Sequence, residues 1–88
     1  MINVKEVAEW QKTLNSMEKQ NSKNPKAFKE SEIQAVQENV ARAVELMTSG
    51  QYSEFLGDLQ NLGVSAKDAM KPKEAIEIVA KFDKIRGY

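Results

Sequence analysis

The segment at residues 33–47 reads IQAVQENVARAVELM. Its apolar residues recur at alternating spacings of three and four, which places them on one face of an α-helix: Ile33, Val36, Val40, Ala43 and Met47. Val44 widens this stripe, and Glu38 and Arg42 are spaced for an ion pair on the same helix face. The segment therefore predicts a long amphipathic helix, around which the rest of the chain is interpreted.

Capping signals mark the expected ends of this helix. We expect Ser31 as its N-cap, with Gln34 completing a capping box, and Gly50 as its C-terminal cap. The alternative is an earlier start, with Asn24 as N-cap and Pro25 in the first helical position. A loop over residues 20–25 comes before either start, because turn-forming side chains and a proline interrupt the apolar pattern there.

An earlier helix is announced near the start of the chain. Asn3 is its expected N-cap, Glu6 stands at the reciprocal capping position, and Ile2 and Val7 occupy the places of a hydrophobic staple. Its apolar face is given by residues at helical spacing: Val7, Trp10, Leu14 and Met17. This face is expected to be buried against the other helices.

A third, shorter helix follows the long one. Its apolar residues again keep a helical period before Gly63 ends it: Tyr52, Phe55, Leu56, Leu59 and Leu62. Gly57 lies inside this helix, where glycine costs about 1 kcal/mol relative to alanine. We therefore expect a neighbouring backbone to approach closely at Gly57.

The last part of the chain is predicted to be a helix interrupted by a proline. Ser65 and Asp68 repeat the start signal of the first helix. Pro72 has no amide hydrogen and disfavours a helical conformation at Lys71, so one helical turn, a break at residues 70–71 and a new helix are expected. That helix runs from Pro72 to about residue 86, ends at Gly87 and buries Ala75, Ile78 or Ile76, Val79, Phe82 and Ile85.

Together these segments predict an all-α fold. It is a small bundle of about four helices in one domain over residues 1–88, with the last helix split or kinked at Pro72. A chain of this size buries only about 60% of the surface that its unfolded form exposes, so self-association would help its thin core. No stretch approaches the ~20 apolar residues of a membrane span, and the first residues lack a secretory signal. We expect a cytoplasmic protein of a bacterium or of a phage-infected host.

The chain contains no histidine and no cysteine. Most proton shuttles at neutral pH, thiol nucleophiles, soft-metal sites and serine–histidine relays need one of these side chains. The remaining acid–base candidates are three carboxylate pairs, which are expected on solvated helix faces: Glu30 with Glu32, Glu54 with Asp58, and Glu74 with Glu77. We therefore predict a protein that is not an enzyme, without catalytic residues, cofactor or metal.

The formal charge is zero, but the charges are unevenly distributed along the chain. Residues 1–29 carry six lysines against three glutamates, whereas residues 30–62 carry one arginine against six acidic residues. Five lysines gather near the first loop: Lys12, Lys19, Lys23, Lys26 and Lys29. Clustered cations can neutralise phosphates, so a nucleic-acid-binding accessory protein is an alternative function. No arginine-rich recognition helix or aromatic platform accompanies them, and nucleic acid is not the expected partner.

The absence of these reactive side chains favours a protein that works by presenting surfaces. We expect a non-catalytic protein–protein interaction module, a small bacterial or phage accessory factor that binds and blocks, scaffolds or regulates a partner, or that forms a homo-oligomer. Trp10 is either a core anchor or a binding residue at the edge of its helix. With the acidic region of residues 30–58 it supplies the candidate partner-binding residues, which are Trp10, Glu38, Glu45, Tyr52, Glu54 and Asp58.

A second alternative comes from a resemblance. The run from Glu38-Asn39-Val40 through Lys71-Pro72-Lys73-Glu74-Ala75 to Phe82 resembles the helical body of phasins, which coat polyester storage granules in bacteria. The resemblance covers about half of the chain, and the chain is less rich in alanine than phasins are. It implies an amphipathic protein that coats an apolar surface.

Overall fold

The computed structural model describes residues 2–87 and contains four α-helices and one short 3-10 turn. The elements are α1 (Val4–Lys23), α2 (Glu30–Leu46), α3 (Ser49–Asn61), the 3-10 turn η1 (Ala66–Asp68) and α4 (Pro72–Arg86). No strand is found in this described range. The predicted all-α fold with about four helices is therefore confirmed.

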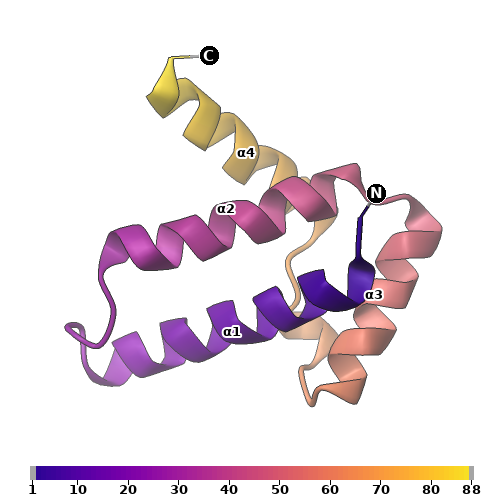
Figure 1. Ribbon diagram of the computed structural model, residues 1–88, viewed down its shortest axis with the longest axis horizontal. Coiled ribbons are helices and arrows are strands. Elements are labelled where there is room, and N and C mark those ends of the chain that lie inside the picture. The colour runs from indigo at the N-terminus through magenta and orange to yellow at the C-terminus, as the bar shows by residue number, and fades with distance from the viewer. Residues whose placement is uncertain (1, 88) are drawn as a thin grey trace.

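The helices form a flat arrangement rather than a parallel-sided bundle. α1 and α2 lie side by side and antiparallel, and α3 packs across α1 (Figure 1). α4 packs extensively on α2 and diverges from the rest, so that the end of α4 projects away from α1 and α3 (Figure 1). The dimensions of 36 × 34 × 20 Å reflect this flatness.

The start of α1 follows its capping signal. The Oδ1 atom of Asn3 accepts a hydrogen bond from the backbone N–H of Glu6 at 3.1 Å. Val7 is buried, and Ile2 packs against the core beside it. The predicted N-cap is therefore confirmed, because a short polar side chain can satisfy an amide that has no partner within the helix.

The ends of α2 differ from both predicted versions. α2 begins at Glu30 after Lys29, which caps it without a side-chain hydrogen bond, so neither Ser31 nor Asn24 is its N-cap. Asn24 instead forms a separate turn, in which its Oδ1 atom accepts from Lys26 N and its carbonyl accepts from Ala27 N. Asn24 therefore forms a turn instead of a helix cap, because an asparagine side chain can accept a backbone N–H in either arrangement.

Gly50 does not end α2 but lies in the first turn of α3. Thr48 begins α3 with a full capping box, in which its hydroxyl accepts from Gln51 N and the Gln51 side chain accepts from Thr48 N. Because this box satisfies two amides at once, it places the helix start before Gly50. The prediction for Gly50 was wrong.

The two glycines of the α3 region have different roles. Gly63 has a φ of 81° and ends the helix, with Val64 N donating to Leu59 O at 2.9 Å, as predicted. Gly57 lies on an exposed surface, and no atom lies within 4 Å of the place where a Cβ would stand. The expected close backbone contact at Gly57 is therefore absent, and nothing in the structure explains this glycine.

The predicted break before the last helix is confirmed. Ser65 caps η1 through a bond from Lys67 N, and the turn is 3-10 rather than α-helical. Ala69 and Lys71 then have extended backbone conformations, with ψ values of 143° and 151°. Pro72 is the first residue of α4, where its missing amide leaves no lost hydrogen bond.

The core lies mainly between α1, α2 and α3. Its most deeply buried large side chains come from these helices: Val7, Val40, Val44, Phe55 and Leu59. α4 adds a thinner stripe of Ala75, Val79 and Phe82, with Ile78 partly buried. Ile85 is 71% exposed, contrary to prediction. The side chain of Arg86 faces α2, and Ile85 lies about 100° around the helix from it, so Ile85 does not face α2.

A search of the described residues for a membrane-crossing helix finds none of sufficient length and apolar character.

Candidate functional site

An apolar groove runs along the outer side of α1. Its volume is about 740 Å³. Apolar side chains from α1, the α1–α2 loop, α2 and the C-cap of α3 form its walls: Met17, Phe28, Val36 and Leu62. Polar and charged side chains form its rim on α1: Glu9, Lys12, Thr13, Ser16 and Gln20. An apolar floor with a polar rim is the general form of a binding groove.

The loop between α1 and α2 holds Phe28 in this groove. Asn21 binds the backbone of Phe28 twice, because its Oδ1 accepts from Phe28 N at 2.9 Å and its Nδ2 donates to Phe28 O at 3.3 Å. Phe28 is the one aromatic residue in a loop of otherwise small and polar residues, and it is half-buried. The amide of Asn21 thus fixes an apolar wall that the loop alone would leave mobile.

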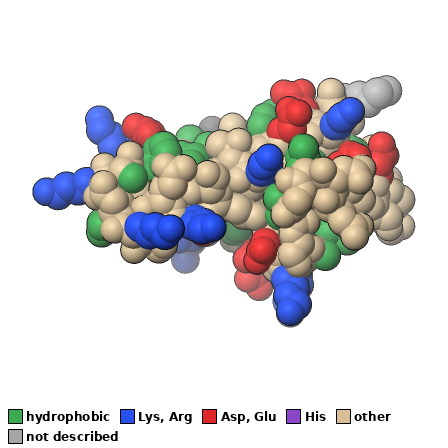
Figure 2. Space-filling view, turned by 90° about the horizontal axis from the view of Figure 1, so that it is seen from below, with side chains coloured by type: hydrophobic (Ala, Val, Ile, Leu, Met, Phe, Trp, Pro, Cys, Tyr) green, Lys and Arg blue, Asp and Glu red, His purple; other side chains and the backbone are tan. Residues whose placement is uncertain are grey.

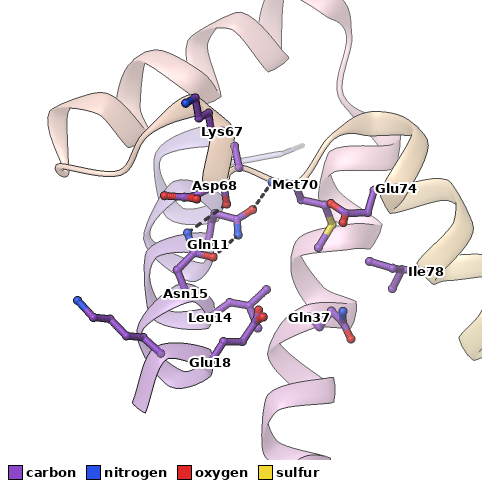
Figure 3. Close-up of a pocket in the computed structure, with 12 residues that line it drawn as sticks. Gln11, Leu14, Asn15, Glu18, Gln37, Lys67, Asp68, Met70, Glu74 and Ile78 are labelled. Atoms are coloured by element: carbon purple, nitrogen blue, oxygen red, sulfur yellow. Dashed lines mark hydrogen bonds between the residues drawn. The ribbon is translucent and has the colours of Figure 1, made fainter. Parts of the chain in front are cut away.

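A polar cleft of about 490 Å³ lies on the other face of α1 (Figure 3). Gln11 is the one buried polar residue of the described chain, with 2% of its surface exposed. Its Oε1 accepts from Met70 N at 2.8 Å, and its Nε2 donates to Asn15 Oδ1 at 3.0 Å. Asn15 Nδ2 in turn donates to Asp68 O at 3.1 Å. This chain of bonds holds the segment between η1 and α4 against α1.

Two of the three carboxylates that line the polar cleft, Glu18 and Glu74, stand on opposite walls of it. Glu18 comes from α1 and Glu74 from α4 (Figure 3). Partial burial raises the pKa of Glu18, and the negative charge of Glu74 raises it further. Burial and the same Glu74 charge also raise the pKa of Tyr52. No group of three or more metal-ligating side chains occurs among the described residues.

Four charged side chains join α2 to α4. Arg42 pairs with Glu38 on its own helix and with Asp83 on α4, both at 2.7 Å, and Arg86 pairs with Glu38. The Glu38 side chain is only 12% exposed. Hydrogen bonds from Arg86 and then Arg42 lower the pKa of Glu38 to about 2. We call Glu38, Arg42, Asp83 and Arg86 the α2–α4 latch.

The structure places the predicted partner-binding residues in several different settings. Trp10 is half-buried against the core, and the Tyr52 hydroxyl donates to Met70 O at 2.9 Å. Glu38 belongs to the α2–α4 latch. The remaining three residues do not join it: Glu45 and Glu54 are exposed on α2 and α3, and Asp58 is half-buried on α3. These residues form no single site, and their part in partner binding stays a prediction.

The five predicted phosphate-contacting lysines are all exposed. Lys12, Lys19 and Lys23 follow one stripe of α1, because residues seven and eleven positions apart share a helix face. Lys26 and Lys29 continue into the loop. Figure 2 shows basic side chains at the end of the molecule that carries the α1–α2 connection, whereas most acidic side chains in that view lie toward α3.

The sequence pattern missed the groove because three of its wall residues were assigned to helix faces facing the core. Met17, Val36 and Leu62 all continue apolar stripes, and periodicity cannot say which end of a stripe remains open to solvent. Phe28 was the available signal, since it is a lone aromatic residue in a polar loop.

Comparisons of the chain with protein-family models, with curated proteins and with solved structures found no match.

Proposed function

We propose that the chain is a non-catalytic protein–protein interaction module that binds an amphipathic helix of a partner protein in the apolar groove. The observation that carries this proposal is the groove itself, with its walls from α1, α2, the α1–α2 loop and the C-cap of α3. A helix lying in such a groove would bury its apolar face against the half-buried Phe28, Val36 and Leu62 while its polar face stays in water.

The amino-acid composition supports a protein that acts by binding a partner through its surface. The chain lacks histidine and cysteine. Glu18, Asp68 and Glu74 all line the polar cleft, but no group of three carboxylates among the described residues is arranged to hold a metal ion. Binding through the groove would act by occupancy, so that the module blocks, scaffolds or regulates the protein that carries the helix.

A pair of matched variants tests the groove. Thr13 is an exposed rim residue, so Thr13→Arg adds bulk and charge at the groove without removing a core contact. Ala80 is exposed on α4 and is not part of the groove lining, so Ala80→Arg is the control. Proteins cross-linked to the wild type and to each variant in host cells would be compared by quantitative mass spectrometry.

The proposal expects at least one protein that is enriched by the wild type and by Ala80→Arg and depleted at least tenfold by Thr13→Arg. A peptide helix from that protein should then bind the isolated wild-type chain and not Thr13→Arg. Equal recovery of every protein by both variants would overturn the groove as the binding site.

The lysine stripe of α1 is the observation in favour of nucleic-acid binding. A protein that neutralises several phosphates loses affinity steeply as salt increases. Retention on a polyanion column at low salt, abolished by charge reversal at Lys19, Lys23 and Lys26, would favour this second function. A wild-type chain that is not retained at low salt would remove it.

A further inference from the structure

α4 is attached to the rest of the molecule through one helix. It packs on α2, where Ala75, Val79 and Phe82 are buried. The α2–α4 latch adds a second kind of contact near the free end of α4, since Asp83 and Arg86 both bind charges on α2. Most of the contacts that hold α4 are therefore made by α2.

The segment before α4 contains a residue whose backbone is held by hydrogen bonds, Met70, and next to it a residue at which the chain can turn, Lys71. Met70 is bound on both sides, by Gln11 Oε1 accepting from its N–H and by the Tyr52 hydroxyl donating to its carbonyl. The Lys71 carbonyl accepts from Ala75 N and moves with α4. The backbone between Met70 and Pro72 is extended, and Pro72 prevents the helix from continuing backwards through it.

We propose that α4 is an exchangeable arm, and that two copies of this chain form a dimer in which α4 of each copy packs on α2 of the other. Rotation at Lys71 changes the direction of α4 while Met70 keeps its bonds to Gln11 and Tyr52. Every contact between α2 and α4 is then made again between the two chains, including the latch. Such exchange is a route to dimers that requires no new interface.

Concentration decides which form predominates. A short tether holds α4 near its own α2 at an effective concentration on the order of millimolar. The wild type is therefore a closed monomer at micromolar concentration, and exchange becomes favourable when chains are crowded or when the closed contact is weakened. The exchange is independent of the groove on α1, so its test does not depend on the proposed partner.

Charge reversal on the two sides of the latch separates exchange from other association. One variant carries Glu38→Arg and Arg42→Glu on α2, and the other carries Asp83→Arg and Arg86→Glu on α4. In either variant alone, like charges face each other across the closed contact. In an exchanged dimer of the two variants, both latches pair opposite charges.

A chain with all four substitutions is the matched control, because its reversed latch again pairs opposite charges within one molecule. It should be a monomer with the helix content of the wild type by circular dichroism. If a double variant does not fold, the milder pair of Arg42→Asp and Asp83→Arg repeats the design at one ion pair.

The two variants are refolded separately and as an equimolar mixture at about 50 µM, well below the millimolar effective concentration, and their masses are measured by light scattering after size-exclusion chromatography. We expect monomers from each separate sample and a one-to-one heterodimer from the mixture. A mixture that contains only monomers would overturn the proposal. Dimers that form equally well in the separate samples would also overturn it, because association would then not depend on the latch.

Discussion

The body formed by α1, α2 and α3 and the arm formed by α4 are held by different interactions. In the body, large side chains from all three helices are removed from water, among them Phe55 and Leu59 with no exposed surface. The arm buries Ala75, Val79 and Phe82 and adds the charged α2–α4 latch. The comparison shows that a chain of 88 residues can support three helices on several neighbours and attach the fourth mostly through a single neighbour.

The largest expected effect comes from the body. Phe55→Ala should lower the free energy of unfolding by about 3–5 kcal/mol, because it removes a fully buried ring and leaves a cavity. Urea unfolding followed by circular dichroism measures the loss. Ile76→Ala is the control, since Ile76 is more than half exposed and its truncation should change stability by less than about 0.5 kcal/mol. Equal effects of the two substitutions would contradict this view of the core.

The same kind of truncation in the arm should act locally. Phe82→Ala should lower the free energy of opening of α4 by about 2 kcal/mol, since the end of α4 can partly collapse around the smaller side chain. Amide hydrogen exchange in α4 should then accelerate about thirtyfold, because each 1.4 kcal/mol is a factor of ten. Exchange in α1 should change far less. Equal acceleration in both helices would show that arm and body open together.

The junction between body and arm depends on one buried amide side chain. Gln11→Leu removes the acceptor of Met70 N–H, and an unsatisfied buried donor costs about 1–3 kcal/mol. Thermal unfolding should detect a loss in that range, and the Met70 amide should lose its protection. Gln60→Leu, at an exposed position of α3, is the matched control. A Gln11→Leu protein as stable as the control would exclude this hydrogen bond as a stabilising contact.

A smaller effect is expected from acid. Hydrogen bonds from Arg86 and Arg42 hold the pKa of Glu38 at about 2, below its ordinary value of 4.5. Because the folded-state pKa is the lower one, this stabilisation is fully present above pH 4.5 and is lost as the pH falls from 4.5 to 2. Melting temperatures of the wild type and Glu38→Gln should therefore converge across this window. A difference that stays constant from pH 7 to pH 2 would contradict the assignment.

The smallest effect has the opposite sign. Burial and the charge of Glu74 raise the pKa of Glu18, so its ionised form is disfavoured in the fold. Glu18→Gln should therefore stabilise the protein slightly at pH 7, by no more than about 0.5 kcal/mol for a largely solvated group. The gain should shrink as the pH falls and the wild-type carboxyl takes up its proton. A loss of stability at pH 7 would show that Glu18 makes a favourable contact instead.

Local signals in the sequence were sufficient for much of the fold. Asn3, Gly63 and Pro72 act through the backbone of their own neighbourhood, so their effects could be read without knowledge of the tertiary structure. The prediction for the start of α2 was wrong, because it relied on a local capping signal that the helix does not use. Ser31 offered a good cap, but the helix already begins at Glu30 after an uncapped Lys29.

The candidate site depends on tertiary contacts, and sequence patterns did not reach it. Glu38 and Arg42 were recognised as a pair within α2, but Asp83 and Arg86 lie more than forty residues away and join them only when α4 docks. The groove likewise combines Met17 of α1 and Val36 of α2 with Leu62, the C-cap of α3. Helical periodicity identifies the apolar face of each helix. It does not show where the apolar faces of two packed helices separate and leave a groove.

Hydrogen exchange of the wild-type chain tests the division into body and arm most directly. Exchange rates of individual amides would be measured by NMR under native conditions and converted to free energies of opening. The account predicts that the amides of α4 (Pro72–Arg86) share a lower opening free energy than those of α1 and α3. One common value for the protected amides of all four helices would contradict it.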